Sequence, residues 1–281
     1  MPAGPVAVRW LGHQIPQPRA GRMELARIEL ENAGSASWLE RPGAALFLSY
    51  HWLDTGGNPI VWEGLRAALP RRVAPAERLL VDLPVRGPIP PGRYRLALDV
   101  VDEGRFWFAE LGNRRLELDL DVAPRLATRS LAAQIGRGPS ALVDETRAAL
   151  ARQEEPVTEI GEATASLAPG CLPAPDWSSR VLDAHEEGYA MVAGSIAVEG
   201  TRRERRALRG ELDSWAPGFG RAPTWELPLL CPSVVQEVLH VAPWRDPVAG
   251  MPALDPATSE LDEPWLCDGR IRIAVSARAL R

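Results

Sequence analysis

The chain has 281 residues, which is enough for two domains with cores of ordinary size. Its hydrophobic content of 46% and charged content of 25% are those of a soluble globular protein. The net charge of −5 gives no bulk attraction to nucleic acid or anionic membrane, and no apolar run approaches the roughly 20 residues of a spanning helix. We therefore expect no nucleic-acid partner and no membrane span.

The cysteines and the first residues favour a reduced, cytoplasmic setting. Cys171, Cys231 and Cys267 are odd in number and widely spaced, so neither a disulfide framework nor a zinc site is indicated. Residues 1–5 lack the basic region and apolar core of a secretory signal. We expect a cytoplasmic protein with no metal and no cofactor.

Residues 1–124 carry short strand patterns separated by turns. The clearest is a hairpin within 46–69, in which side chains alternate over 46–53, turn-forming residues occupy 54–59, and a strand resumes at 60–62. Further strands are expected at 6–10, 24–31, 79–85, 94–100, 106–109 and 116–122. About seven short strands at this spacing, with no helix pattern between them, predict an all-β antiparallel sandwich.

Two places in this sandwich combine an indole with a carboxylate. They are Trp62 with Glu63, and Trp107 with Glu110. An indole face packs well on the C–H face of a sugar ring, and a carboxylate accepts hydrogen bonds from sugar hydroxyls. These four residues are therefore the candidate ligand-binding residues.

The same aromatic residues could instead fill a core, because large aromatic side chains dominate small cores. Trp52 shares its strand face with apolar residues and is predicted to be a core residue. Trp62 and Trp107 fit either interpretation. His51 alternates with the apolar face, so it is predicted to be an exposed strand residue rather than a ligand.

Four segments of this region carry a resemblance to a known module. They are ENAGSASW at 31–38, LSYHW at 48–52, VWEGLRAALP at 61–70 and PPGRYRLALDVVDEGRFWFAELG at 90–112. Together they resemble an immunoglobulin-like module of bacterial cell-surface carbohydrate proteins, which is often attached to glycosyltransferases or methyltransferases. They are also distantly similar to the tryptophan-bearing immunoglobulin-like domain of autophagy receptors. The resemblance covers most of 20–115 and implies an immunoglobulin-like sandwich.

After residue 124 the sequence pattern changes from strands alone to a mixture of helices and strands. Residues 125–160 are predicted to form a helical connector, with a helix over 140–152. Residues 161–281 predict a smaller, mixed α/β domain, with strands at 163–167, 189–198 and 270–275 and helices at 176–187 and 234–239. A further helix is expected from Thr201, which forms a capping box with Glu204.

Three stretches of this second domain resemble the second half of a family-2 glycosyltransferase of the GT-A type, namely 166–185, 192–239 and 259–280. That resemblance implies a degenerate enzyme. Residues 168–170 are Ala, Pro and Gly where the family has metal-binding acids, and none of them coordinates through a side chain. The family's catalytic base would fall among Glu260, Asp262 and Glu263, which also fit a solvated helix start.

The nucleotide-binding half of that family is mostly missing, since 125–160 has room for one βαβ unit at most. We therefore predict a non-catalytic accessory protein of bacterial cell-surface polysaccharide or glycan biosynthesis, a pseudoenzyme that binds carbohydrate or a glycan-assembly protein. One alternative is an active glycosyltransferase that works without a metal or is completed by a partner chain. Another is a protein–protein interaction module that docks through its sheet edges and the arginine-rich segment 202–209.

Overall fold

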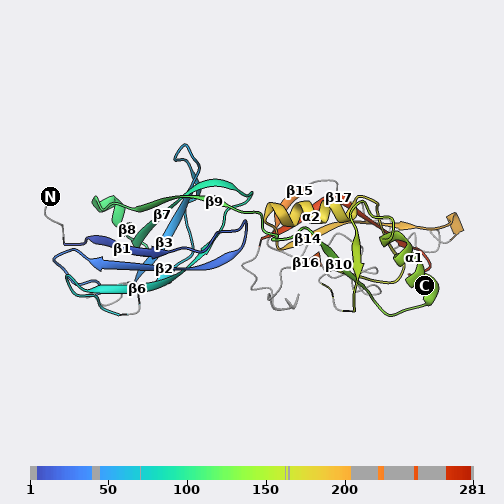
Figure 1. The fold of residues 1–281 in the computed structure, drawn as a ribbon, viewed down its shortest axis with the longest axis horizontal. Helices are drawn as coiled ribbons and strands as arrows, with labels where there is room; N and C mark the ends of the chain where they lie inside the picture. The colour runs from blue at the N-terminus through green and yellow to red at the C-terminus, as the bar shows by residue number, and fades with distance from the viewer. Residues whose placement is uncertain are drawn as a thin grey trace. The chain divides into compact units, whose positions relative to one another are not determined.

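The computed structural model describes residues 5–39, 45–69, 71–161, 163, 165–203, 221–224, 244–245 and 264–279. The chain divides into two compact units, Met1–Pro124 and Arg125–Arg281. Strands account for far more of the described residues than helices do (Figure 1). Within these ranges, no helix has the length and apolar character needed to cross a membrane.

Two antiparallel sheets build the first unit (Figure 1). One has the strand order β1-β2-β6, and the other has the order β4-β3-β7-β8, with β5 also paired to β3 and β9 to β7. The strands of the first sheet are β1 (Val8–Gln14), β2 (Met23–Asn32) and β6 (Arg78–Arg86). Those of the second are β3 (Leu46–Leu53), β4 (Pro59–Val61), β5 (Ala67–Ala68), β7 (Gly92–Asp102), β8 (Phe106–Trp107) and β9 (Leu116–Val122). A 3-10 turn, η1 (Phe108–Leu111), follows β8.

The core of this unit lies between the two sheets and follows from the two-residue period of the strands. Every second side chain of a central strand points inward and is buried. The inward residues include Ile28 and Leu30 of β2, Leu48, Tyr50 and Trp52 of β3, Val81 and Leu83 of β6, and Leu96, Leu98 and Val100 of β7. The prediction that Trp52 is a core residue is confirmed, since its side chain is fully buried and its Nε1 donates to the carbonyl of Arg86 at 2.8 Å.

The expected hairpin is present. β3 has the expected bounds and pairs antiparallel with β4, Trp52 lying opposite Val61. The segment expected as a strand over 106–109 becomes β8 followed by η1, which ends at Gly112 with φ 85°. β5 is an element that the sequence pattern did not indicate, because two residues are too short to show a period.

The described part of the second unit contains two helices of 11 residues, α1 (Ser140–Leu150) and α2 (Trp177–Glu187). β10 (Leu131–Ile135) lies between β11 (Val157–Glu159) and β12 (Ala165–Leu167) and is parallel to both. β17 (Trp265–Ser276) runs parallel to β14 (Met191–Glu199) and antiparallel to β13 (Cys171–Pro173) and β15 (Arg221–Thr224). β16 (Trp244–Arg245) pairs with β14.

Helix α2 forms where it was expected, and its apolar stripe is buried, with Trp177, Val181 and Leu182 at most 1% exposed. The segment 125–160 is more than a helical connector, because it carries β10 and β11 beside α1. Leu131 and Ala133 of β10 are buried, so this short apolar run packs as a strand of a parallel sheet. The helices expected after Thr201 and over 234–239 fall almost entirely outside the described residues.

We expect Leu98→Ala to lower the free energy of unfolding of the first unit by roughly 2–5 kcal/mol, because it leaves a cavity in the core. Leu25→Ala is the matched control, since Leu25 is 64% exposed, and we expect a change within about 0.5 kcal/mol. Native-state hydrogen exchange at the β3 and β7 amides of the full chain measures both. Equal losses for the two variants would contradict the two-sheet core.

Candidate functional site

The candidate site lies on the outer face of the sheet that contains β3 and β7. Ser49 and His51 of β3 point away from the core, opposite Asp99 and Ala97 of β7. These polar residues are nevertheless buried, with Ser49 and His51 at 0% exposure and Asp99 at 1%. The prediction that His51 is exposed is therefore wrong, because other parts of the chain cover this face.

One covering segment is a bulge in the edge strand. Between β4 and β5, the five residues 62–66 lie opposite only three residues of β3, 49–51. Such a bulge bends the strand and redirects its side chains. Gly64 permits it, because a Cβ at this position would lie 2.4 Å from the carbonyl oxygen of Tyr50. The Gly64 N–H donates to that oxygen at 3.0 Å.

The bulge and the β8 segment bring three rings together, and we call His51, Trp62 and Trp107 the aromatic cluster. The rings of His51 and Trp62 are stacked, with centroids 4.1 Å apart and an interplanar angle of 23°. The rings of His51 and Trp107 are 4.4 Å apart, and those of the two tryptophans are 6.5 Å apart. Trp107 is buried at 7% exposure, whereas Trp62 is 41% exposed. Trp62 is thus the member that a ligand can contact.

Arg66 ties the bulge to the sheet and to the aromatic cluster. It donates to Ser49 Oγ at 3.1 Å and to Glu103 Oε2 at 2.8 Å, and it also pairs with Glu63. Its guanidinium carbon lies 5.1 Å from the centroid of Trp107, within the range of a cation–π contact. The result is a row of alternating charge, Glu63, Arg66 and Glu103, next to the aromatic cluster.

Arg115 makes a second charged contact with the cluster. Its guanidinium carbon lies 5.0 Å from the centroid of Trp62, and its Nε donates to Asp99 Oδ2 at 3.3 Å. Glu110 is exposed, and its Oε2 accepts a hydrogen bond from the backbone N–H of Trp107 at 3.2 Å. Glu110 therefore fixes the backbone that carries Trp107 and is itself exposed.

Burial changes the acid–base properties of His51 and Asp99, two titratable groups on the covered face of the sheet. Burial lowers the pKa of His51 below its ordinary value of 6.5, outweighing its hydrogen bond to the carbonyl of Trp62. A carbonyl only accepts, so His51 Nδ1 carries the proton in that bond. Burial raises the pKa of Asp99, although the Val100 N–H and Arg115 both donate to its carboxylate.

The structure gathers Trp62, Glu63, Trp107 and Glu110, the four candidates from the sequence, around one buried histidine. It adds His51, Arg66, Arg115 and Glu103, which sequence reasoning did not select. The period of β3 shows that Ser49 and His51 share a face, and this is the one signal that the sequence offered. The other candidates, Glu260, Asp262 and Glu263, lie outside the described residues. Within the described ranges, no group of three His, Cys, Asp or Glu side chains is arranged to hold a metal ion.

No protein-family model matches the chain, and no curated protein matches it. Solved structures similar to it include the C-terminal domain of Wzt, with 8% identity over 43% of this chain and 76% of that one, at a TM-score of 0.29. The PapD-like domain 7 of human CEP192 is 17% identical, and the match covers 43% of this chain and 87% of that one, with a TM-score of 0.24. A conjugative transposon lipoprotein from Bacteroides eggerthii is 15% identical, and the match covers 41% of this chain and 96% of that one, with a TM-score of 0.21. These weak likenesses span less than half of the chain.

We expect His51 to make stability pH-dependent. The pKa of His51 is lower in the folded state than in the unfolded state, so below about pH 6.5 the unfolded state binds more protons. The contribution of His51 to the free energy of unfolding is therefore complete above that pH and is lost as the pH falls through the folded pKa. Asp99 changes the free energy of unfolding with pH in the opposite direction, because its pKa is raised in the folded state. The measurement is therefore the difference in unfolding free energy between the wild type and His51→Phe from pH 7 to pH 5. A difference that does not change over this range would contradict the assignment.

Proposed function

We propose that residues 1–124 form an immunoglobulin-like, non-catalytic carbohydrate-binding domain, and that the protein is an accessory protein of bacterial cell-surface glycan assembly. In this proposal an α/β domain follows, and the protein works in the cytoplasm. The observation that carries the proposal is the half-exposed ring of Trp62, which is stacked on buried His51 and bordered by exposed carboxylates.

The fixed position of Trp62 favours binding. Its ring is held by stacking on His51 and by the guanidinium of Arg115, and its carbonyl accepts a hydrogen bond from His51, so little conformational freedom is lost when a ligand contacts the exposed part of the ring. The carboxylates of Glu63 and Glu103, with side chains 60% and 48% exposed, can accept hydrogen bonds from sugar hydroxyls.

The charge of the site favours a neutral sugar. Three carboxylates, those of Glu63, Glu103 and Glu110, are exposed at the surface around Trp62 and Trp107. The two arginines of the site are more deeply placed, with side chains only 24% and 21% exposed. An acidic sugar would meet net negative charge at the surface, so an uncharged hexose polymer is the better ligand.

The glycosyltransferase alternative depends on Glu260, Asp262 and Glu263. These acids lie outside the described residues, and no family match supports an enzyme of that class. The binding proposal is independent of them, because it rests on the first unit alone.

We expect Trp62→Ala to weaken binding of a neutral polysaccharide at least about tenfold, because it removes the ring on which a sugar would pack. Affinity electrophoresis of the full chain in gels that contain neutral or acidic polysaccharides provides the measurement. Ile60→Ala is the control, since Ile60 lies in the same hairpin and is 47% exposed. Wild-type protein that no neutral polysaccharide retards, or an Ile60→Ala variant as impaired as Trp62→Ala, would refute the proposal.

One observation favours a second function, that of a protein-interaction module. The outer face of the β1-β2-β6 sheet exposes large apolar side chains, with Leu25 at 64%, Leu80 at 57% and Met23 at 50%. Met23 and Leu25 lie on one side of the Arg27–Asp82 pair of this face and Leu80 on the other, and exposed large apolar side chains often mark surfaces that bind other proteins. The face also holds the Arg27–Asp82 ion pair, with Nε and Oδ1 3.1 Å apart.

If this face binds a protein, the double variant Leu25→Glu, Leu80→Glu should lose its partners in cross-linked cell extracts, because two buried charges would oppose the contact. Trp62→Ala should keep them, since Trp62 belongs to the other sheet. Identical sets of partners for the wild type and the double variant would exclude this function.

A further inference from the structure

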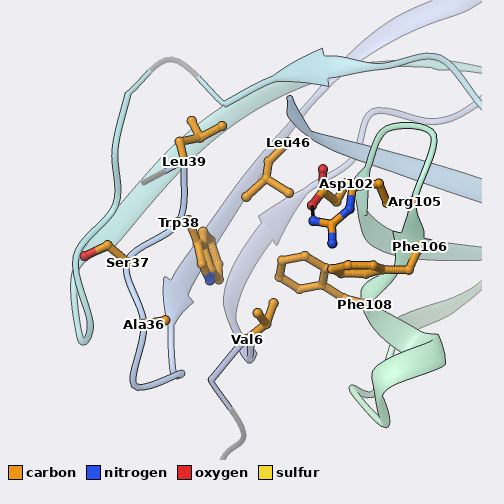
Figure 2. A pocket seen from close by; sticks show the side chains of 10 residues that line it. All are labelled: Val6, Ala36, Ser37, Trp38, Leu39, Leu46, Asp102, Arg105, Phe106 and Phe108. Atoms are coloured by element: carbon orange, nitrogen blue, oxygen red, sulfur yellow. Dashed lines mark hydrogen bonds and ion pairs between the residues drawn. The ribbon is translucent and has the colours of Figure 1, made fainter. Parts of the chain in front are cut away.

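Large apolar side chains are exposed on the outer face of the β1-β2-β6 sheet. Met23 and Leu25 of β2 are 50% and 64% exposed, and Leu80 of β6 is 57% exposed. By contrast, Trp38 and Phe108, which line the hollow in Figure 2, meet edge to face and are only 2% and 0% exposed. Those two rings belong to the core of the unit, whereas the side chains on the outer sheet face can contact a partner.

The outward residues of β2 and β6 form rows across the two strands, because the strands are antiparallel and pair in continuous register. Three rows combine residues that attract each other or are both apolar, namely Leu25 with Pro84, Arg27 with Asp82, and Glu31 with Arg78. The other two outward rows are Met23 with Arg86 and Glu29 with Leu80. Each row of two charges therefore has an arginine on one strand and an acid on the other.

This arrangement makes the face complementary to itself. In a dimer with two-fold symmetry, both copies use the same surface. A two-fold axis that runs parallel to the strands, between β2 and β6, places β2 of one copy over β6 of the other, with every residue in its own row. Arg27 of each copy then lies over Asp82 of the other, and Glu31 lies over Arg78. Sheets that pack face to face with nearly aligned strands are a common arrangement.

The row of Arg27 and Asp82 favours a second copy over a partner of one charge sign. Within one copy Arg27 Nε lies 3.1 Å from Asp82 Oδ1, and both side chains are more than half exposed, so this pair alone stabilises the chain little. In the dimer the row becomes a ring of four charges with alternating sign, in which each charge has two opposite neighbours. An acidic or a basic partner would instead place like charges against one member of the row.

The size of the face indicates a weak dimer. Three strands about 4.8 Å apart, each about nine residues long with a rise of about 3.4 Å per residue, form a face of roughly 14 by 30 Å. A standard protein interface buries about 800 Å² on each partner, so this face lies at the small end of the range. We therefore expect a reversible dimer with a dissociation constant in the micromolar range or weaker.

We propose that the outer face of the β1-β2-β6 sheet binds the same face of a second copy of this chain, about a two-fold axis parallel to the strands. The exposed Leu25 side chains of the two copies pack at this interface against Pro84, and the charged rows fix the alignment of the two sheets. The inference rests on the interaction face described as the second function, and it names the partner. It is independent of the carbohydrate proposal, because Trp62 belongs to the other sheet.

Sedimentation velocity of the full chain tests the proposal at protein concentrations from about 1 to 300 μM, the range in which a weak interface associates. We expect the mass of the wild type to rise from one chain toward two. Arg27→Asp and Asp82→Arg each give the central row four like charges, and each should raise the dissociation constant at least about tenfold. An equimolar mixture of the two variants restores opposite charges across the interface and should recover the dimer.

Arg93→Asp is the matched control, because Arg93 and Asp121 form an exposed cross-strand pair of the same chemistry on the other sheet, and it should leave the dissociation constant unchanged. A wild type that stays monomeric over the whole concentration range would overturn the proposal, and so would a mixture that associates no better than its two components. If the wild type is monomeric but the variant with Leu25→Glu and Leu80→Glu still loses partners in cell extracts, the second function stands with a different partner.

Discussion

The stacking of Trp62 on His51 is the contact on which the candidate site depends. His51 points away from the core, on a sheet face that would ordinarily meet water, and the ring of Trp62 lies 4.1 Å above it. This contact holds the bulge against β3, and the bulge in turn places Arg66 over Trp107 and beside Ser49. The unit therefore has a second buried layer outside its main core, built from rings and paired charges instead of aliphatic side chains.

The period of two made most of the first unit predictable. The strict alternation over 46–53 and 94–100 gave strands close to the observed β3 and β7, and it identified Trp52 as a core residue. The same alternation misplaced His51. It distinguishes the two faces of a strand, but it does not show whether another segment covers the outer face. That information lies in the packing of residues 62–66, which only the folded chain brings next to β3.

The positions of the candidate residues could likewise be predicted only in part from the sequence. Pairing an indole with a carboxylate selected Trp62, Glu63, Trp107 and Glu110, and these residues do meet at one place. Their different exposure could not be predicted, because it depends on how deeply each ring enters the layer above the sheet. In the second unit, β10 and β11 were missed because segments of three to five residues are too short for their pattern to separate strand from helix.

The bulge at residues 62–66 also affects how the protein behaves at high concentration. β4 and β5 lie along one edge of their sheet. A regular edge strand exposes a row of unpaired N–H and C=O groups, with which a strand of another chain can pair. Here the row is interrupted, since five residues stand opposite three, and the exposed carboxylate of Glu63 lies at the interruption. The geometry that leaves Trp62 exposed thereby also interrupts the row of edge groups on which another strand could pair. Straightening this segment would remove both properties together.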